Sequence, residues 1–215
     1  DIAKNLDLTP EAFERERKIV EEEYRADIGS DQKYYDQAAW RGTWSLDGGI
    51  FLNQAIHHID MMQWLLGPIH SLTAMIKRRL VKIETEDVGA VILKFKSGAI
   101  GNLNANVLTY PKNYEGSVTI IGEFGTVKIG GIALNEIKEW KFKDQVQTQD
   151  PFLENYKTND VYGNGHYSFY HNVYNSLFSN QNFVSDGAEG IKSIKLLEAI
   201  YLSQKNNKEI YLDEI

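Results

Sequence analysis

Polar side chains around His57 are spaced in a way that suits proton transfer. Asn53, His57, Asp60 and Trp64 recur at intervals of four, three and four residues. On a helix of about 3.6 residues per turn, these side chains share one side. An imidazole beside an amide and a carboxylate can take up or release a proton near neutral pH. The spacing therefore predicts a candidate acid–base site centred on His57.

A plainer interpretation of the same residues is the solvated face of an amphipathic helix, with His57 bonded to Asp60 one turn later. The residues before the helix favour function instead, because Gly48 and Gly49 let a ligand or another backbone come close. An indole also stands on each side of Arg41 in the sequence WRGTW. Both interpretations remain open from the residues alone.

The helix that would carry this site is predicted to run without a break from Gly49 to Leu66. Gly67-Pro68 ends it. Its apolar residues form a stripe nearly opposite the polar one, at helical spacing. They are Leu52, Ala55, Ile56, Ile59, Met62 and Leu66. We expect this stripe to face the core.

The chain from Ile69 to about Phe142 is rich in Val, Ile and Thr with glycines between the runs, which is typical of antiparallel strands. Ser97-Gly98 predicts a hairpin turn. Alternation predicts a buried face of Val91, Leu93, Phe95, Leu103, Ala105 and Val107. It predicts a polar face of Lys94, Lys96, Asn102, Asn104 and Asn106. One apolar and one polar face indicate an open sheet.

Further helices are predicted at about Pro10–Ala26, His166–Phe178 and Ala188–Gln204, and a last strand at Glu209–Leu212. Residues 1–33 are a charged helical segment, and residues 34–215 form a second unit. The order of elements predicts an α+β fold, an open and mainly antiparallel sheet with helices packed on one face.

Composition excludes several classes of function. The chain has 215 residues, no cysteine and a formal net charge of −7. A nucleic-acid backbone or an anionic membrane surface would repel that charge, so we expect neither partner. Without cysteine there are no disulfides or zinc–thiolate sites, and no metal site is predicted. No run of about 18 apolar residues suggests a membrane span. We expect a cytoplasmic protein.

The segment DGGIFLNQAIHHID resembles the signature helix of the glucose-fructose oxidoreductase and inositol dehydrogenase family, usually G-G-G-x-L-x-D-x-G-x-H-x-x-D. The positions that match are Gly48, Gly49, His57 and Asp60. The positions that depart are Asp47, Asn53 and Ala55. Because Asn53 replaces an aspartate that often shares proton transfer in the family, the resemblance leaves His57 as the stronger base.

The resemblance extends over residues 34–212. The Asn-Gln variant of the signature, YYDQAAWRGTW before it and YPKNYEGSVTIIGEFGTVKIGG after it are similar to one branch of the family. That branch acts on UDP-N-acetylglucosaminuronic acid and related nucleotide sugars in the synthesis of surface polysaccharides such as lipopolysaccharide. Residues 1–31 depart from the family.

In this family a dinucleotide-binding Rossmann domain accompanies a substrate domain, and only the second is expected in this chain. The Rossmann fingerprint G-x-G-x-x-G should follow a strand and open a helix. The glycines of GEFGTVKIGG lie between strands and predict a hairpin turn. The family's E-K-P motif is also absent. The resemblance thus implies NAD in an intact enzyme, with neither tight NAD binding nor turnover by this chain alone.

The resemblance also implies roles for single residues. His57 would be the base, or a proton relay with the absent lysine, and Asn53 and Gln54 would bind sugar hydroxyls. Arg41 would pair with a carboxylate or phosphate, or else form a structural ion pair. The other substrate-binding candidates are Asp60, Asn113 and Tyr114.

The polar face of the sheet commonly mediates assembly in this family, which implies a homo-oligomer, either a dimer or a tetramer. The residues suited to such an interface are Ile100, Asn102, Asn104, Asn106 and Leu108. Two other functions remain open. One is a stand-alone sugar-nucleotide binding or scaffolding module, and the other is NAD-dependent glycoside cleavage.

Overall fold

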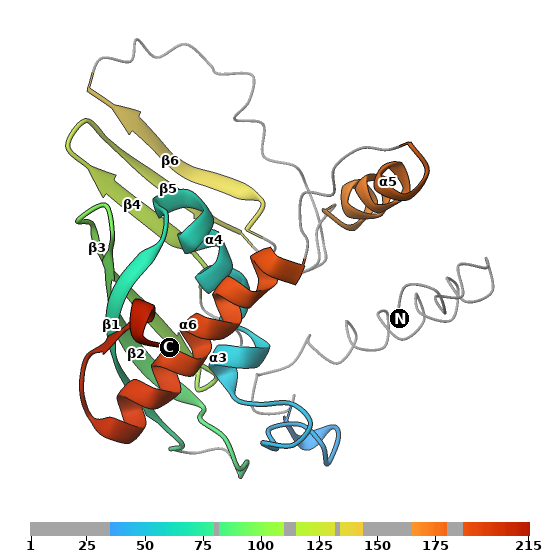
Figure 1. Ribbon diagram of the computed structural model, residues 1–215, viewed down its shortest axis with the longest axis vertical. Helices are drawn as coiled ribbons and strands as arrows, with labels where there is room; N and C mark the ends of the chain where they lie inside the picture. The colour runs from blue at the N-terminus through green and yellow to red at the C-terminus, as the bar shows by residue number, and fades with distance from the viewer. Residues whose placement is uncertain (1–34, 80–81, 110–114, 132–133, 144–164, 180–186) are drawn as a thin grey trace.

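The computed structural model describes residues 35–79, 82–109, 115–131, 134–143, 165–179 and 187–215. It has the predicted α+β class, with open antiparallel sheets and three of the four described α-helices gathered on one face of the larger sheet (Figure 1). The predicted helix at Pro10–Ala26, and the charged segment 1–33 as a whole, lie outside the described residues.

The larger sheet has four antiparallel strands in the order β3-β2-β1-β7. They are β1 (Ile69–Lys77), β2 (Val88–Phe95), β3 (Ile100–Asn106) and β7 (Ile210–Tyr211). The predicted hairpin joins β2 to β3, and Gly98 takes the φ of +91° that its turn requires. The last strand is shorter than predicted, since Leu212–Glu214 forms a 3₁₀ turn.

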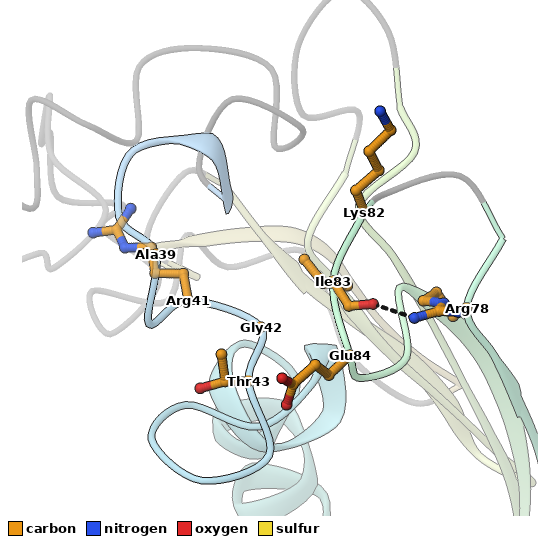
Figure 2. A pocket seen from close by; sticks show the side chains of 8 residues that line it. All are labelled: Ala39, Arg41, Gly42, Thr43, Arg78, Lys82, Ile83 and Glu84. Carbon is orange, nitrogen blue, oxygen red and sulfur yellow. Dashed lines mark hydrogen bonds between the residues drawn. The ribbon is translucent and has the colours of Figure 1, made fainter.

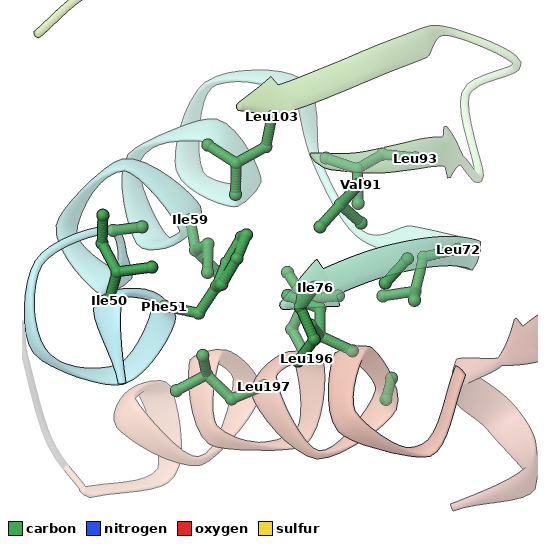
Figure 3. Close-up of a cluster of buried hydrophobic side chains, with 14 of the residues drawn as sticks. Ile50, Phe51, Ile59, Leu72, Ile76, Val91, Leu93, Leu103, Leu196 and Leu197 are labelled. Atoms are coloured by element: carbon green, nitrogen blue, oxygen red, sulfur yellow. The ribbon is translucent and has the colours of Figure 1, made fainter. Parts of the chain in front are cut away.

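The buried face of this sheet packs against α3, α4 and α6, and the core lies between them (Figure 3). Helix α6 spans Gly187–Asn206, close to its predicted bounds, and its Leu196 and Leu197 point towards the strands. Val91, Leu93 and Phe95 are buried as their alternation predicted.

Three further strands form a sheet of their own, in the order β4-β5-β6, where the sequence predicted one continuous sheet. They are β4 (Val118–Gly122), β5 (Gly125–Gly130) and β6 (Glu136–Phe142). Gly122 pairs with Gly125 across the β4–β5 turn, which confirms that GEFGTVKIGG is a hairpin. Strand alternation alone does not reveal where one sheet ends and the next begins.

The prediction of one unbroken helix from Gly49 to Leu66 was wrong. Two helices replace it, α3 (Ile50–Asn53) and α4 (Ile56–Leu66). The backbone N–H of Ala55 reaches back to the carbonyl of Ile50 at 2.8 Å, one residue further than in a regular α-helix. This wide turn lets Ile50 and Phe51, which the predicted stripe omitted, enter the core, where Phe51 is completely buried.

Helix α5 spans Gly165–Phe178, one residue longer than predicted, and lies apart from the sheet that α6 covers (Figure 1). None of its residues is buried. It is the exception to the predicted packing of helices on one face of the sheet.

Candidate functional site

Asp47 organises the turn that leads into α3. One oxygen of its carboxylate, Oδ2, accepts the backbone N–H of Gly42 at 2.6 Å. The other, Oδ1, accepts Asn53 Nδ2 at 2.6 Å. The amide oxygen of Asn53 in turn accepts Gln54 Nε2 at 2.6 Å. The two amides predicted to bind sugar hydroxyls are therefore linked to each other and held from the preceding turn.

His57 and His58 lie in the first turn of α4. His57 is exposed and His58 is half-buried. Burial lowers the pKa of His58, and the neighbouring His57 lowers it further. His58 is therefore held towards its neutral form, while His57 is the ring that faces outward from the domain.

Asp60 contacts α6 rather than His57 in the part of the chain that the structure describes. Its Oδ1 accepts the hydroxyl of Ser193 at 2.8 Å, and that hydroxyl accepts Gln63 Nε2 at 3.3 Å. The predicted bond between His57 and Asp60 is replaced by this contact across 133 residues of sequence. Asp60 therefore fixes α4 against α6.

Arg41 is buried, with 8% of its surface exposed. Its guanidinium donates to Gln37 Oε1 at 2.6 Å and lies 5.3 Å from the ring centre of Trp40. Arg41 lines a cavity of about 510 Å³ together with two other cations, Arg78 and Lys82. Figure 2 shows Arg41 on one wall and Arg78 on the other, where Arg78 donates to the carbonyl of Ile83.

Glu84–Asp87, a polar segment that the sequence did not mark as part of the site, precedes β2 and binds the turn before α3. Glu84 Oε2 accepts the backbone N–H of Trp44 at 3.0 Å. The Thr85 hydroxyl lies 3.2 Å from the carbonyl of Gly42 and 3.1 Å from that of Gly48. A sequence signal was present, because ETED stands directly before an apolar strand, but burial of three of these four residues is visible only in the fold.

Glu86 connects this segment to α3 and α6. Its backbone carbonyl accepts Ile50 N–H at 3.2 Å, and its Oε1 accepts Phe51 N–H at 3.1 Å. The hydroxyl of Tyr201, on α6, also donates to Oε1, at 3.1 Å. Burial raises the pKa of Glu86, and burial followed by the charge of Glu86 raises the pKa of Tyr201. The Tyr201 ring meets Trp44 edge-on at 5.4 Å.

Two predicted site residues, Asn113 and Tyr114, lie outside the described residues. Within the described ranges, no group of three or more His, Asp or Glu side chains is placed to hold a metal ion. Nor does any helix in these ranges combine the length and apolar character needed to cross a membrane.

A family model described as the C-terminal alpha/beta domain of the oxidoreductase family matches residues 18–212. The WlbA dehydrogenase of Bordetella pertussis, solved with NADH and UDP-GlcNAcA, is 46% identical, with a TM-score of 0.77 over 84% of this chain. The WlbA dehydrogenase of Chromobacterium violaceum, solved with the same two ligands, is 39% identical, with a TM-score of 0.74 over 92% of this chain.

A more distant relative, the D-apiose dehydrogenase of Rhizobium rhizogenes, is 24% identical over 72% of this chain. The chain spans about half the length of these relatives: 52% and 58% of the two WlbA chains, and 46% of the apiose enzyme.

Proposed function

Because this chain belongs to the oxidoreductase family through its C-terminal alpha/beta domain, we propose that it is the substrate domain of an NAD-dependent dehydrogenase. The proposed substrate is a nucleotide sugar of the UDP-N-acetylglucosaminuronic acid type. One observation carries this proposal, namely 46% identity to a dehydrogenase solved with NADH and UDP-GlcNAcA. The proposed setting is cytoplasmic synthesis of a surface polysaccharide.

The proposed reaction oxidises a sugar hydroxyl to a ketone. The carbon gives up a hydride, for which NAD is the acceptor, and the hydroxyl proton passes to a base. His57 is that base or a relay to it, because it begins α4 and follows the linked amides of Asn53 and Gln54, although its exposed ring does not line the cavity beside Arg41. The two amides bind sugar hydroxyls, and Asp60 contributes its second oxygen, Oδ2.

The anionic part of such a substrate suits the cavity beside Arg41. Three cations, Arg41, Arg78 and Lys82, line it together with Glu84, so its charge favours a carboxylate or a diphosphate. The cavity adjoins the turn from Gly42 to Gly48, which Asp47 ties to Asn53. Asn113 and Tyr114 stay in the proposal as further residues of the substrate site.

The described residues do not suit NAD by themselves. The glycine-rich segment that could suggest a phosphate loop is the β4–β5 hairpin, which opens no helix. We therefore place the cofactor's binding site on a dinucleotide-binding domain of the full-length protein, outside this chain. This chain alone is expected to bind NAD weakly and to turn over no substrate.

Turnover by the full-length protein tests this function. We expect NADH to form with UDP-N-acetylglucosaminuronic acid and not with UDP-N-acetylglucosamine, which lacks the carboxylate. His57→Asn should lower kcat by about 100-fold or more, as loss of a general base does. Glu198→Gln, at an exposed position of α6, is the control. Equal rates with both sugars, release of a glycoside aglycone, or no reaction with either would each reject the proposal.

We also propose that the outer face of the four-stranded sheet forms a homo-oligomer. This face carries three exposed apolar side chains, Met75, Ile92 and Ile100, at 69%, 50% and 78% exposure. The asparagines at 102, 104 and 106 surround them on β3. Ile92→Glu should convert a dimer or tetramer into a monomer in sedimentation, whereas Ile121→Glu on the other sheet should not. A wild-type protein that sediments as a monomer at micromolar concentration would contradict this assembly.

A further inference from the structure

The buried carboxyl of Glu86 joins three elements around the candidate site. Glu86 lies two residues before β2. Its carboxyl accepts hydrogen bonds from the backbone N–H of Phe51 in α3 and from the hydroxyl of Tyr201 in α6. Both donors meet the same oxygen, Oε1. The residue is only 4% exposed, and Oε2 has no hydrogen-bond partner among the described residues. Burial of a carboxyl lowers the stability of the fold unless hydrogen bonds compensate for the lost contact with water. The position of Glu86 therefore calls for a structural or functional explanation.

Gly49 provides the space that this carboxyl occupies. A side chain at position 49 would collide with all three terminal atoms of Glu86. The backbone of Gly49 has a φ of −99°, which any residue can adopt, so space and not backbone conformation calls for glycine here. Gly49 therefore allows the Glu86 carboxyl to pack against the first turn of α3.

The position of α3 matters because this helix has only four residues. Its last residue is Asn53, which precedes Gln54 and the His57 of the next helix. A helix this short has almost no stability of its own, so bonds from outside fix its orientation. Asp47 holds one end of α3 through Asn53, and Glu86 holds the other through Ile50 and Phe51.

We propose that Glu86 is a positioning residue of the site, acting through α3 to orient Asn53, Gln54 and His57 towards the sugar. This inference rests on the proposed function. Glu86 does not touch the substrate, and its carboxyl acts as a hydrogen-bond acceptor shared by Phe51 and Tyr201. One acceptor oxygen is enough for this role, so glutamine at position 86 preserves it and alanine removes it.

Kinetics of the full-length protein with UDP-N-acetylglucosaminuronic acid and NAD test the inference. Glu86→Ala should lower kcat by about 10-fold to 100-fold with a smaller change in KM, because small misplacements of reacting groups have effects of that order. Glu86→Gln should restore kcat to within about 3-fold of wild type. Leu93→Ala, a buried sheet residue, is the control for lost stability and should leave kcat unchanged well below its Tm.

Hydrogen exchange separates this inference from the function on which it rests. In Glu86→Ala, exchange should rise in the peptide that covers residues 50–57 and stay unchanged in β2, whereas Glu86→Gln should match wild type. This readout needs no turnover, so absence of activity in the wild type would reject the function alone. Unchanged exchange in Glu86→Ala, or a kcat of Glu86→Gln as low as that of Glu86→Ala, would overturn the positioning role.

Discussion

Helices α5 and α6 follow each other among the described elements and have opposite surroundings. Helix α6 packs against β1 and α4, and six of its residues are buried: Ser193, Leu196, Leu197, Ala199, Ile200 and Ser203. Helix α5 is the more apolar in sequence, yet none of its residues is buried. Helical periodicity therefore predicts that an element forms, while burial depends on which surface meets it.

The apolar residues of α5 gather on one half of the helix. At about 100° per residue they cover a half circle, and serines and asparagines occupy the rest. The apolar residues are Tyr167, Phe169, Tyr170, Val173, Tyr174, Leu177 and Phe178. In α6 the apolar residues are covered by the strands. The two helices therefore have similar apolar patterns and differ in whether another element packs against them.

The largest effect is expected from Leu196→Ala in α6. Leu196 is 1% exposed and points into the core beneath β1 (Figure 3). Removal of its side chain should lower the free energy of unfolding by about 2–5 kcal/mol. Denaturant titration of this chain measures that change.

Leu177→Ala in α5 is the matched control for Leu196. Because Leu177 is 60% exposed, the same substitution there should change the free energy of unfolding by less than about 0.5 kcal/mol. Equal losses at the two positions would show that α5 is covered as well as α6 is, and would remove the contrast.

Ser203→Ala should give the next largest effect. The Ser203 hydroxyl, near the end of α6, accepts the Ala74 N–H of β1 at 2.9 Å and donates to the carbonyl of Lys208 at 2.7 Å. Its loss leaves a buried N–H and a carbonyl unsatisfied, at a cost of about 1–3 kcal/mol in the free energy of unfolding. Ser176→Ala in α5 is the control. A cost at Ser203 no larger than at Ser176 would mean that these bonds contribute little.

Local patterns in the sequence predicted much of this fold. Helix α6, the β2–β3 hairpin and the buried row Val91, Leu93 and Phe95 follow from periods of 3.6 and 2 and from one turn glycine. These features depend on neighbours a few residues away, which is why they can be read from the sequence.

The contacts that hold the candidate site are long-range, and that is why they could not be predicted. Asp60 meets Ser193 across 133 positions, and Glu86 meets Tyr201 across 115. The break between α3 and α4 also accompanies a tertiary feature, since Phe51, just before the wide turn at Ala55, is completely buried. The family signature predicted His57, Asn53 and Gln54 as site residues, but it gave no information about the contacts that fix them.

Glu86 is bonded to Tyr201 of α6, the covered helix of the pair. Glu86→Gln should therefore change how the free energy of unfolding depends on pH. Burial raises the pKa of Glu86 above its ordinary value of 4.5, so the folded state keeps this proton to a higher pH than the unfolded state. Its contribution is therefore greatest below pH 4.5 and is lost as pH rises through the raised pKa. Wild type minus Glu86→Gln should show a falling difference in the free energy of unfolding as pH increases.

Subtracting the variant from the wild type cancels the contribution of the exposed acids Glu209 and Asp213. Their pKa values are lowered, so their effect on stability changes with pH in the opposite direction. The hydrogen bond from Lys94 lowers the pKa of Glu209, and the one from Lys96 lowers that of Asp213, so their contributions are lost as pH falls. Both ion pairs are present in each protein and cancel. A difference that stays flat or rises with pH would mean that folding does not raise the pKa of Glu86.

Tyr174→Ser should have the smallest effect on stability, because Tyr174 is 59% exposed in the middle of the apolar half of α5. The free energy of unfolding of this chain should change by less than about 0.5 kcal/mol. Its solubility should nevertheless rise, since exposed aromatic patches favour association. Light scattering over a concentration series measures that change, and Asn175→Ser on the polar half is the control. A loss of stability at Tyr174 comparable to that of Leu196→Ala would show that α5 has a covering surface within this chain, and the two helices would then differ in degree and not in kind.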